Sequence, residues 1–212
     1  MGTDGVLLGA LCAAENARYV LEVGTGSGLI ALMIAQRNPQ AKILGIDIAA
    51  EAVQLAQINF GKSNYTTRLV AQHVDYKCFR STEKFDFIVC NPPFFEPNDS
   101  RKDKIARQTV EIDPTSFMAK SSEILAEEGQ ISIIIPSAQS ENYISCAKRC
   151  KLFLKRKIDI FGIENGDMKR NVLEFSFMED QVQYETFIIE KSPRKYSDQY
   201  LELTKEFHVF RK

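Results

Sequence analysis

Short apolar runs alternate with longer helix-forming segments through most of this chain, and this alternation predicts strands and helices in turn. The apolar runs are nearly continuous, as expected for central strands of a sheet that is covered on both faces. We expect strands at 18–24, 41–48, 66–75, 85–91 and 130–136. Several of the segments between them end at glycine or Asn-Pro, which are helix stop signals. We expect helices at 29–37, 49–63, 116–129 and 140–153.

The order of these elements predicts the fold class. A strand, a helix and a second parallel strand need a crossover connection, so repetition of this unit builds a parallel sheet with helices on both faces. Three further strand-like runs follow without helices between them, at 152–163, 171–178 and 184–191. An antiparallel edge that closes the sheet is the simplest interpretation of these runs. We therefore expect an α/β fold with a Rossmann-like, mostly parallel seven-stranded sheet, helices on both faces and an antiparallel C-terminal edge.

Length and composition agree with one globular domain. The chain has 212 residues, of which 44% are hydrophobic and 26% are charged, enough apolar material for a substantial core. Within a single domain over 1–212 we expect a cofactor-binding core at 1–150 and C-terminal strands with a tail at 151–212, including a short helix at 196–207. The net charge of −1 creates no global field for nucleic acid, so any such binding must depend on local patches.

Several classes of protein are disfavoured by simple counts. The longest apolar runs fall far short of the ~20 residues that a membrane span requires, and the first residues lack the basic region of a signal peptide. The five cysteines form no C-x-x-C pair and the two histidines lie far apart, so we expect no metal site. The odd cysteine count suits a reducing compartment. We expect a cytoplasmic monomer with no membrane partner.

The stretch LEVGTGSGLIAL places Gly24, Gly26 and Gly28 between a strand and a helix. In an open α/β sheet, ligands bind beyond the carboxyl ends of the strands, where such a loop lies. The spacing is G-x-G-x-G rather than the dinucleotide pattern G-x-G-x-x-G, and Glu22 precedes it. A carboxylate there would repel a pyrophosphate and suit a cation. S-adenosylmethionine fits, because it carries a sulfonium and an ammonium and no phosphate; an ordinary tight turn is the alternative.

Two further acids follow the next strands. Asp47 ends the second strand 19 positions after Gly28, close to the ~20 positions expected for an acid that binds both ribose hydroxyls. Asp75 ends the third strand, where its carboxylate is expected to reach the adenine amine of the cofactor. The alternative for both acids is a helix cap or a turn.

The fourth strand ends in Asn91, and Pro92, Pro93 and Phe94 follow. The lone pair of a nucleobase amine is delocalised into its ring, and two hydrogen-bond acceptors aimed at its N–H groups help to localise that pair. The Asn91 side-chain carbonyl and the Pro92 backbone carbonyl are the candidate acceptors, held in place by the restraint that Pro93 imposes. Phe94 offers a face on which a flipped base stacks. A rigid turn with exposed aromatic residues is the alternative, and we interpret Cys90 as core packing rather than a nucleophile.

The segments EVGTGSG, GIDI, HVD and NPPFF, in this order, resemble class I S-adenosylmethionine-dependent methyltransferases that act on amines. The opening GTDGVLLGA at 2–10 and the segment YLELTKEF at 200–207 make the chain similar to the bacterial valine-tRNA adenine-37 N6-methyltransferases. Such relatives usually carry roughly thirty residues before the GTDG motif, where this chain begins.

The resemblance implies a role for each matched residue. Thr3 and Asp4 are expected near the methionine end of the cofactor. The remaining expected cofactor contacts are Glu22, Gly24, Gly26, Asp47, Asp75 and Asn91. The expected contacts of the target adenine are Asn91, Pro92 and Phe94.

Basic residues cluster directly after the NPPFF stretch, at 101–107. Lysine and arginine supply most phosphate contacts to nucleic acids, and the neighbouring phenylalanines favour an RNA-binding role over a merely solvated face. The expected RNA contacts are Phe95, Arg101, Lys102, Lys104 and Arg107. A second basic cluster lies at 148–157.

These observations favour direct transfer of a methyl group from S-adenosylmethionine to a nucleobase amine. The resemblance implies that this amine is N6 of an adenine in tRNA, at position 37 of a valine tRNA. Three alternatives stay open at this point. In the first, the methyl acceptor is guanine N2 in ribosomal RNA or a glutamine side chain, both of which are planar delocalised amines. In the second, the protein is a nicotinamide oxidoreductase, which the glycine spacing opposes. In the third, it is a non-catalytic module that binds RNA or cofactor, which the intact Asp47 and Asn91 oppose.

Overall fold

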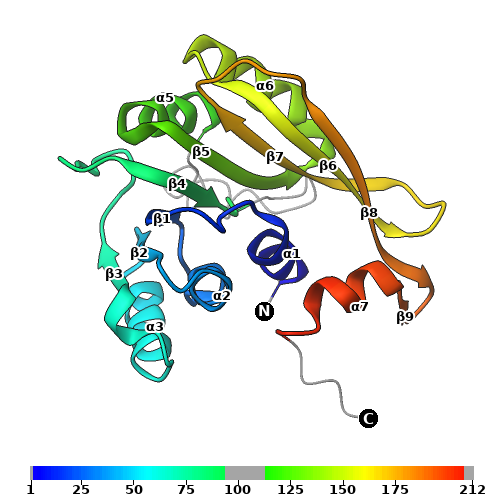
Figure 1. Cartoon of the computed structure of the whole chain (residues 1–212), viewed down its shortest axis with the longest axis horizontal. Helices are drawn as coiled ribbons and strands as arrows, with labels where there is room; N and C mark the ends of the chain where they lie inside the picture. The colour runs from blue at the N-terminus through cyan, green and yellow to red at the C-terminus, as the bar shows by residue number, and fades with distance from the viewer. Residues whose placement is uncertain (1, 94–112, 208–212) are drawn as a thin grey trace, which may run out of the picture.

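The protein is an α/β sandwich around one twisted sheet (Figure 1). The computed structural model describes residues 2–93 and 113–207. Within those ranges, nine strands form a single sheet in the order β3-β2-β1-β4-β5-β7-β6-β8-β9. The α/β class and the mostly parallel character expected from the sequence are confirmed, whereas seven strands are too few. All eight strand-like runs of the sequence join the sheet, and the short β9 adds one more at the C-terminal edge.

The N-terminal half of the sheet is parallel throughout. Burial is nearly continuous along Tyr19–Val23 and Phe85–Cys90, between helices on both faces, and this explains their apolar sequences. The edge strand Leu69–His73 instead has exposed residues. The shared direction brings their carboxyl ends to one edge of the sheet. The strands are β1 (Tyr19–Val23), β2 (Lys42–Asp47), β3 (Leu69–His73), β4 (Phe85–Cys90) and β5 (Leu125–Pro136).

The C-terminal half is mixed. β7 (Met168–Ser176) runs antiparallel to β5 on one side and to β6 (Phe153–Ile163) on the other. β8 (Gln183–Ser192) is parallel to β6 and antiparallel to β9 (Lys195–Tyr196). The antiparallel edge expected from the sequence is therefore present at β7, but β8 departs from it. The reason is topological. β5 and β6 already pair with the two edges of β7, so β8 pairs with the free edge of β6 instead.

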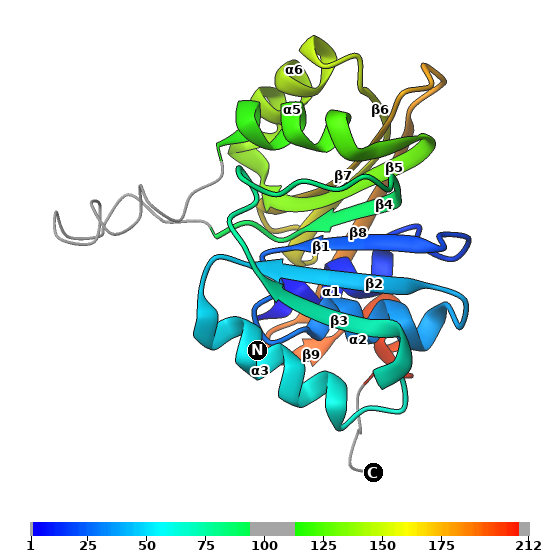
Figure 2. The same ribbon diagram turned by 90° about the vertical axis from the view of Figure 1, so that its left-hand side faces the viewer.

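Helices pack on both faces of the sheet (Figures 1 and 2). Two large apolar cores result, beside a third small cluster of Val6, Ala10 and Met33. One lies beneath α1, α2, α3 and α7, and the other lies beneath α5 and α6. Every helix in the described ranges is too short or too polar to cross a lipid bilayer. The helices are α1 (Thr3–Leu11), α2 (Leu29–Arg37), α3 (Ala50–Gly61), α5 (Pro114–Ile124), α6 (Ser140–Arg149) and α7 (Asp198–Thr204).

The sequence did not predict α1 as a helix. Its residues from Gly5 to Ala10 are all buried, because the helix packs against α2, α7 and the sheet. A helix covered on most sides lacks the polar stripe that marks a surface helix. Its apolar TDGVLLGAL sequence therefore shows no helical period.

The expected helix at 116–129 is wrong at its C-terminal end. α5 begins after Asp113, whose side chain caps the helix by accepting a hydrogen bond from the Ser116 amide at 3.0 Å. It ends at Ile124, and β5 starts at Leu125, which pairs with Phe85. The following Ala-Glu-Glu residues favour a helix by propensity, but burial of Leu125 and pairing with β4 override that preference.

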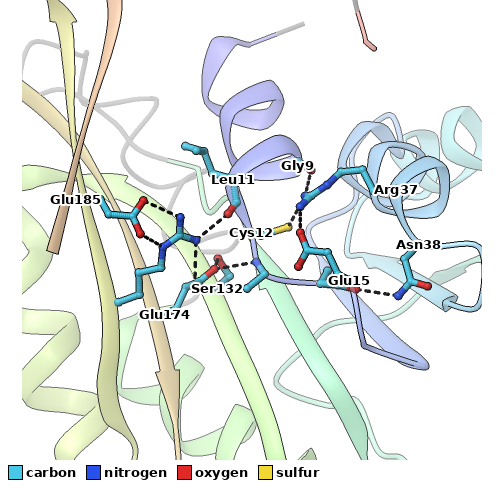
Figure 3. A network of polar contacts seen from close by, with 12 residues as sticks. Gly9, Leu11, Cys12, Glu15, Arg37, Asn38, Ser132, Glu174 and Glu185 are labelled. Atoms are coloured by element: carbon cyan, nitrogen blue, oxygen red, sulfur yellow. Dashed lines mark hydrogen bonds and ion pairs between the residues drawn. The ribbon is translucent and has the colours of Figure 1, made fainter. Parts of the chain in front are cut away.

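A buried polar network ties the C-terminus of α1 to the sheet (Figure 3). Arg156 on β6 donates to the Leu11 carbonyl at 2.9 Å and pairs with Glu185 on β8 and Glu174 on β7. Glu174 is 2% exposed and accepts from the Ala13 amide at 3.0 Å. The network closes the end of α1, where orphan carbonyls need partners.

We predict that Glu174→Ala lowers the free energy of unfolding by about 2–4 kcal/mol, because it leaves the half-buried Ala13 amide without its acceptor and Arg156 without its buried carboxylate. Glu185→Ala is the matched control, since Glu185 pairs with the same guanidinium from a half-exposed position, and it should cost about 1 kcal/mol or less. Urea unfolding measures both. Equal losses in the two variants would contradict the anchoring role of Glu174.

Candidate active site

The carboxyl ends of β1, β2 and β4 converge with the segment after β3 on one cavity. Its volume is about 280 Å³. Val23 pairs with Ile46 on one side and with Cys90 on the other, so the residues that follow these strands emerge side by side. The cavity is lined by Val23, Gly24, Ile46, Asp47, Ile48, Val74, Asp75, Tyr76, Lys77, Cys90, Asn91, Pro92 and Pro93.

The glycine loop leaves β1 bonded to the end of β2. The amides of Gly24 and Thr25 both donate to the Ile46 carbonyl at 2.9 Å. Gly24 and Gly26 have φ values of +72° and +55°, and a Cβ atom built on either would meet nothing within 4 Å. Their backbone therefore faces open space in a conformation that favours glycine, which gives a ligand direct access to the main chain.

Glu22 lies beneath this loop and is 1% exposed. Its Oε2 atom accepts a hydrogen bond from Thr25 Oγ1 at 2.6 Å and one from the Ala31 amide at 3.2 Å. Burial raises the pKa of the Glu22 carboxyl to about 8, against the lowering effect of these hydrogen bonds.

Glu22 also lines a second cavity of about 170 Å³, between the loop and the N-terminus of α1. Gly24 and Asn91 line both cavities. The two spaces therefore meet at the end of β4, beside the loop.

The acids after β2 and β3 both line the larger cavity and also hold local backbone. Asp47 accepts from the Gly26 amide and from the Ala49 amide, each at 2.9 Å. Asp75 accepts from the Lys77 amide at 2.9 Å. Both acids therefore stabilise a local turn, which was the alternative considered from the sequence. Both also line the cavity wall.

Asn91 stands at the junction of the two cavities. A Cβ atom on Gly5 would lie 3.9 Å from Asn91 Nδ2 and 3.4 Å from Leu29 Cδ2, so the first turn of α1 closes over the asparagine. Pro92 and Pro93 continue along the wall of the larger cavity. The sequence did not anticipate the role of Gly5, although the GTDG motif that contains it pointed to the same end of the site.

The other expected site residues are placed differently or lie outside the described ranges. Asp4 pairs with Arg170 at the start of β7, Nε to Oδ2 at 3.0 Å, and Thr3 is exposed. The smaller cavity touches Gly2 and Gly5 of this segment instead. Cys90 is buried, which raises the pKa of its thiol and agrees with a packing role. The residues outside the described ranges are Phe94, Phe95, Arg101, Lys102, Lys104 and Arg107.

Residues 2–150 match the model of the methyltransferase small domain family. The chain belongs to this family. It is a class I S-adenosylmethionine-dependent methyltransferase, so the expected enzyme class and cofactor are confirmed. In the described part of the chain, no three histidine, cysteine, aspartate or glutamate side chains lie close enough together to hold a metal ion.

Similar proteins agree along the whole chain. A protein of a Flavobacteriaceae bacterium named tRNA1(Val) (adenine(37)-N6)-methyltransferase is 47% identical over 99% of this chain and 91% of its own length. Proteins of the same name from Phocaeicola vulgatus and Vibrio campbellii are 38% and 33% identical, again over 99% of this chain, and over 90% and 88% of their own lengths.

Solved structures show the same fold. A predicted O-methyltransferase from Agrobacterium tumefaciens superposes with a TM-score of 0.76 over 98% of each chain at 16% identity. The glycopeptide N-methyltransferase MtfA superposes with a TM-score of 0.63 over 82% of this chain and 91% of its own at 10% identity.

The cavities suit S-adenosylmethionine. Three carboxylates line them, at Glu22, Asp47 and Asp75, which disfavours a phosphate and favours a ligand with cationic groups, hydroxyls and an amine. The open main chain at Gly24 and Gly26 allows close approach. When bound, this cofactor supplies an electrophilic methyl group carried by a sulfonium.

We predict that Gly5→Leu weakens the binding of S-adenosylmethionine about tenfold or more, because the added side chain must displace Leu29 or Asn91 from a packed wall. Gly5→Ala is the matched control: its single Cβ fits at ordinary contact distance, and alanine favours the helix by about 1 kcal/mol. Isothermal titration calorimetry measures both. Normal binding by Gly5→Leu would show that α1 does not form this wall.

Proposed function

We propose that this protein transfers a methyl group from S-adenosylmethionine to the N6 amine of adenosine 37 in a valine tRNA, in the cytoplasm. One structural observation carries the proposal: Asn91, followed by two prolines, lines both the cavity with the ribose-type acid and the cavity with Glu22. The similar proteins named above support the choice of nucleotide and of RNA. Adenine is therefore favoured over guanine N2 or glutamine as the acceptor.

The cofactor would be held by groups from three strands. Asp47 bonds the Gly26 and Ala49 amides, which uses two of its roughly four acceptor positions and leaves others for the ribose hydroxyls. Asp75, on the same cavity wall, takes the adenine amine. Glu22, in the smaller cavity, takes the ammonium at the methionine end. Gly24 and Gly26 present open backbone between them.

The target amine would be positioned by Asn91 and Pro92. The Asn91 Oδ1 atom and the Pro92 carbonyl accept its two N–H groups, which favours a pyramidal nitrogen with its lone pair free to react. Pro93 restrains the Pro92 backbone to extended conformations and so limits movement of that carbonyl. Catalysis on this scheme is orientation and electrostatic positioning, and the proton leaves the nitrogen after transfer. Phe94 is proposed as the stacking face for the base.

Thr3 and Asp4 would belong to the methionine end indirectly, since Asp4 fastens the first turn of α1 to Arg170. The RNA contacts proposed from sequence are Phe95, Arg101, Lys102, Lys104 and Arg107, which follow Asn91 directly in the chain. We further propose that residues 1–212 act as one domain and as a monomer, with the cofactor site in 1–150 and the C-terminal strands at 151–212 completing the sheet.

The proposal is tested with methyl-labelled S-adenosylmethionine and total tRNA from a strain that lacks this gene. We predict labelled N6-methyladenosine at position 37 of a valine tRNA, detected by nucleoside mass spectrometry of the purified tRNA. Asn91→Ala should reduce this transfer about 100-fold or more, as expected for loss of a preorganised polar group, while calorimetry shows near-normal cofactor binding. Label in another nucleoside, or full activity without the Asn91 side chain, would contradict the proposal.

We predict that Asp47→Ala weakens S-adenosylmethionine binding by about 2–3 kcal/mol, because acceptors for two hydroxyls are lost. Asp86→Ala is the matched control. Asp86 also accepts two backbone amides, from Arg18 at 2.8 Å and Tyr19 at 2.9 Å, but it lies at the amino end of β4. Calorimetry should therefore show an almost unchanged dissociation constant for Asp86→Ala. An unchanged constant in Asp47→Ala would refute the ribose role.

A further inference from the structure

Thr25 is the one residue between Gly24 and Gly26, and its side chain packs into the protein against Gly45 of β2. It is 4% exposed. A Cβ atom on Gly45 of β2 would lie 2.6 Å from Thr25 Oγ1 and 2.9 Å from Thr25 Cβ. Only a glycine at position 45 leaves room for this side chain. β2 therefore provides a notch that fits the threonine and directs its hydroxyl to one partner.

That partner is Glu22 Oε2, at 2.6 Å. The same oxygen accepts the Ala31 amide, the first-turn amide of α2, at 3.2 Å. An amide N–H can only donate, so Oε2 accepts this bond, and an ionised Glu22 accepts the Thr25 hydroxyl at the same oxygen. Glu22 also lines the smaller cavity. Protonation of its carboxyl and binding of a cation in that cavity would therefore compete.

We propose that Thr25 is a positioning residue, which holds the Glu22 carboxylate in the orientation and the charge state that accept the cationic methionine end of S-adenosylmethionine. The proposal rests on the cofactor role proposed for Glu22 above. Thr25 acts only through Glu22, since its hydroxyl donates its hydrogen bond to that carboxylate. It gives the threonine in the G-x-G-x-G loop a task distinct from that of the glycines, which supply open backbone.

The groups around Glu22 explain why such help is needed. From β2 it faces the carboxylate of Asp47, which disfavours a second negative charge. From β4 it faces the thiol of Cys90, whose ionisation burial and these two acids disfavour. From α2 it receives the Ile30 and Ala31 amides, and the nearest residue of α1 in the cavity is Gly5. Burial is the largest effect and raises the pKa to about 8; the Thr25 hydrogen bond is the largest effect that lowers it.

In the ligand-free protein Glu22 is largely protonated below pH 8, and binding of a cation requires its ionised form. Affinity for S-adenosylmethionine should therefore fall as pH decreases below 8, with release of a proton on binding. Loss of the Thr25 hydroxyl should move the Glu22 pKa further up and extend this loss of affinity to higher pH.

The first test needs no ligand. Protein labelled with carbon-13 at the glutamate carboxyls is titrated by NMR, and the Glu22 signal is assigned by its absence in Glu22→Gln. We predict a midpoint near pH 8 for the parent protein and a midpoint about one pH unit higher in Thr25→Val, which has the same shape without the donor. Thr25→Ser should restore the parent midpoint. Equal midpoints in the parent protein and Thr25→Val would overturn the proposal.

The second test is calorimetry with S-adenosylmethionine at pH 7. We predict about tenfold weaker binding by Thr25→Val, matching a one-unit shift, and binding within about twofold of the parent by Thr25→Ser. The amino group of the ligand titrates alike in every experiment and cancels from the comparison. Thermal unfolding checks that each variant folds; if Thr25→Val does not, Thr25→Ala supplies the same comparison. Neither test uses tRNA, so failure of the proposed RNA reaction would leave these results unaffected, and the reverse.

Discussion

The site depends on one bifurcated contact, in which the Gly24 and Thr25 amides share the Ile46 carbonyl. This contact continues the β1–β2 pairing past the end of β1, so the loop cannot swing away from β2. Asp47, the next residue after Ile46, then reaches the Gly26 amide. Glu22 beneath the loop, the loop itself and Asp47 beside the loop are thereby held as one unit. A shift of one residue in the β1–β2 register would separate all three.

The second half of the site depends on α1. Its C-terminal end is held by the Arg156 and Glu174 network, and Arg37 of α2 donates to the Gly9 carbonyl at 2.8 Å. Because α1 is held firmly at its C-terminal end, its first turn can lie against Asn91 even though it presents no side chain there. Gly5 serves this approach, and the Asp4–Arg170 pair secures the turn to β7. The C-terminal strands thus contribute to the site by fastening the helix that covers it.

The parts of this structure that the sequence predicted are those in which chain order and spatial order coincide. Parallel strands deliver their carboxyl ends to one edge, so Glu22, Asp47 and Asn91 could be grouped from strand ends alone. The sequence did not predict α1, because a buried helix carries no amphipathic period. The end of α5 was misplaced because pairing of Leu125 outweighed helix propensity. Thr25 could not be recognised, since its role appears only when Gly45, twenty positions away, is seen to make room for it.

The distribution of charge also explains how one site can accommodate three acidic side chains. Three carboxylates around joined cavities would repel one another if all were ionised, and burial adds to that cost. A Glu22 that is protonated below pH 8 removes the most buried of the three charges while no ligand is present. On the role proposed for Glu22, a cationic ligand would reverse this, because the favourable contact it makes would restore the ionised form. Charge would then arise in the deepest part of the site only together with its partner, so that a buried acid could serve binding without a buried unpaired charge.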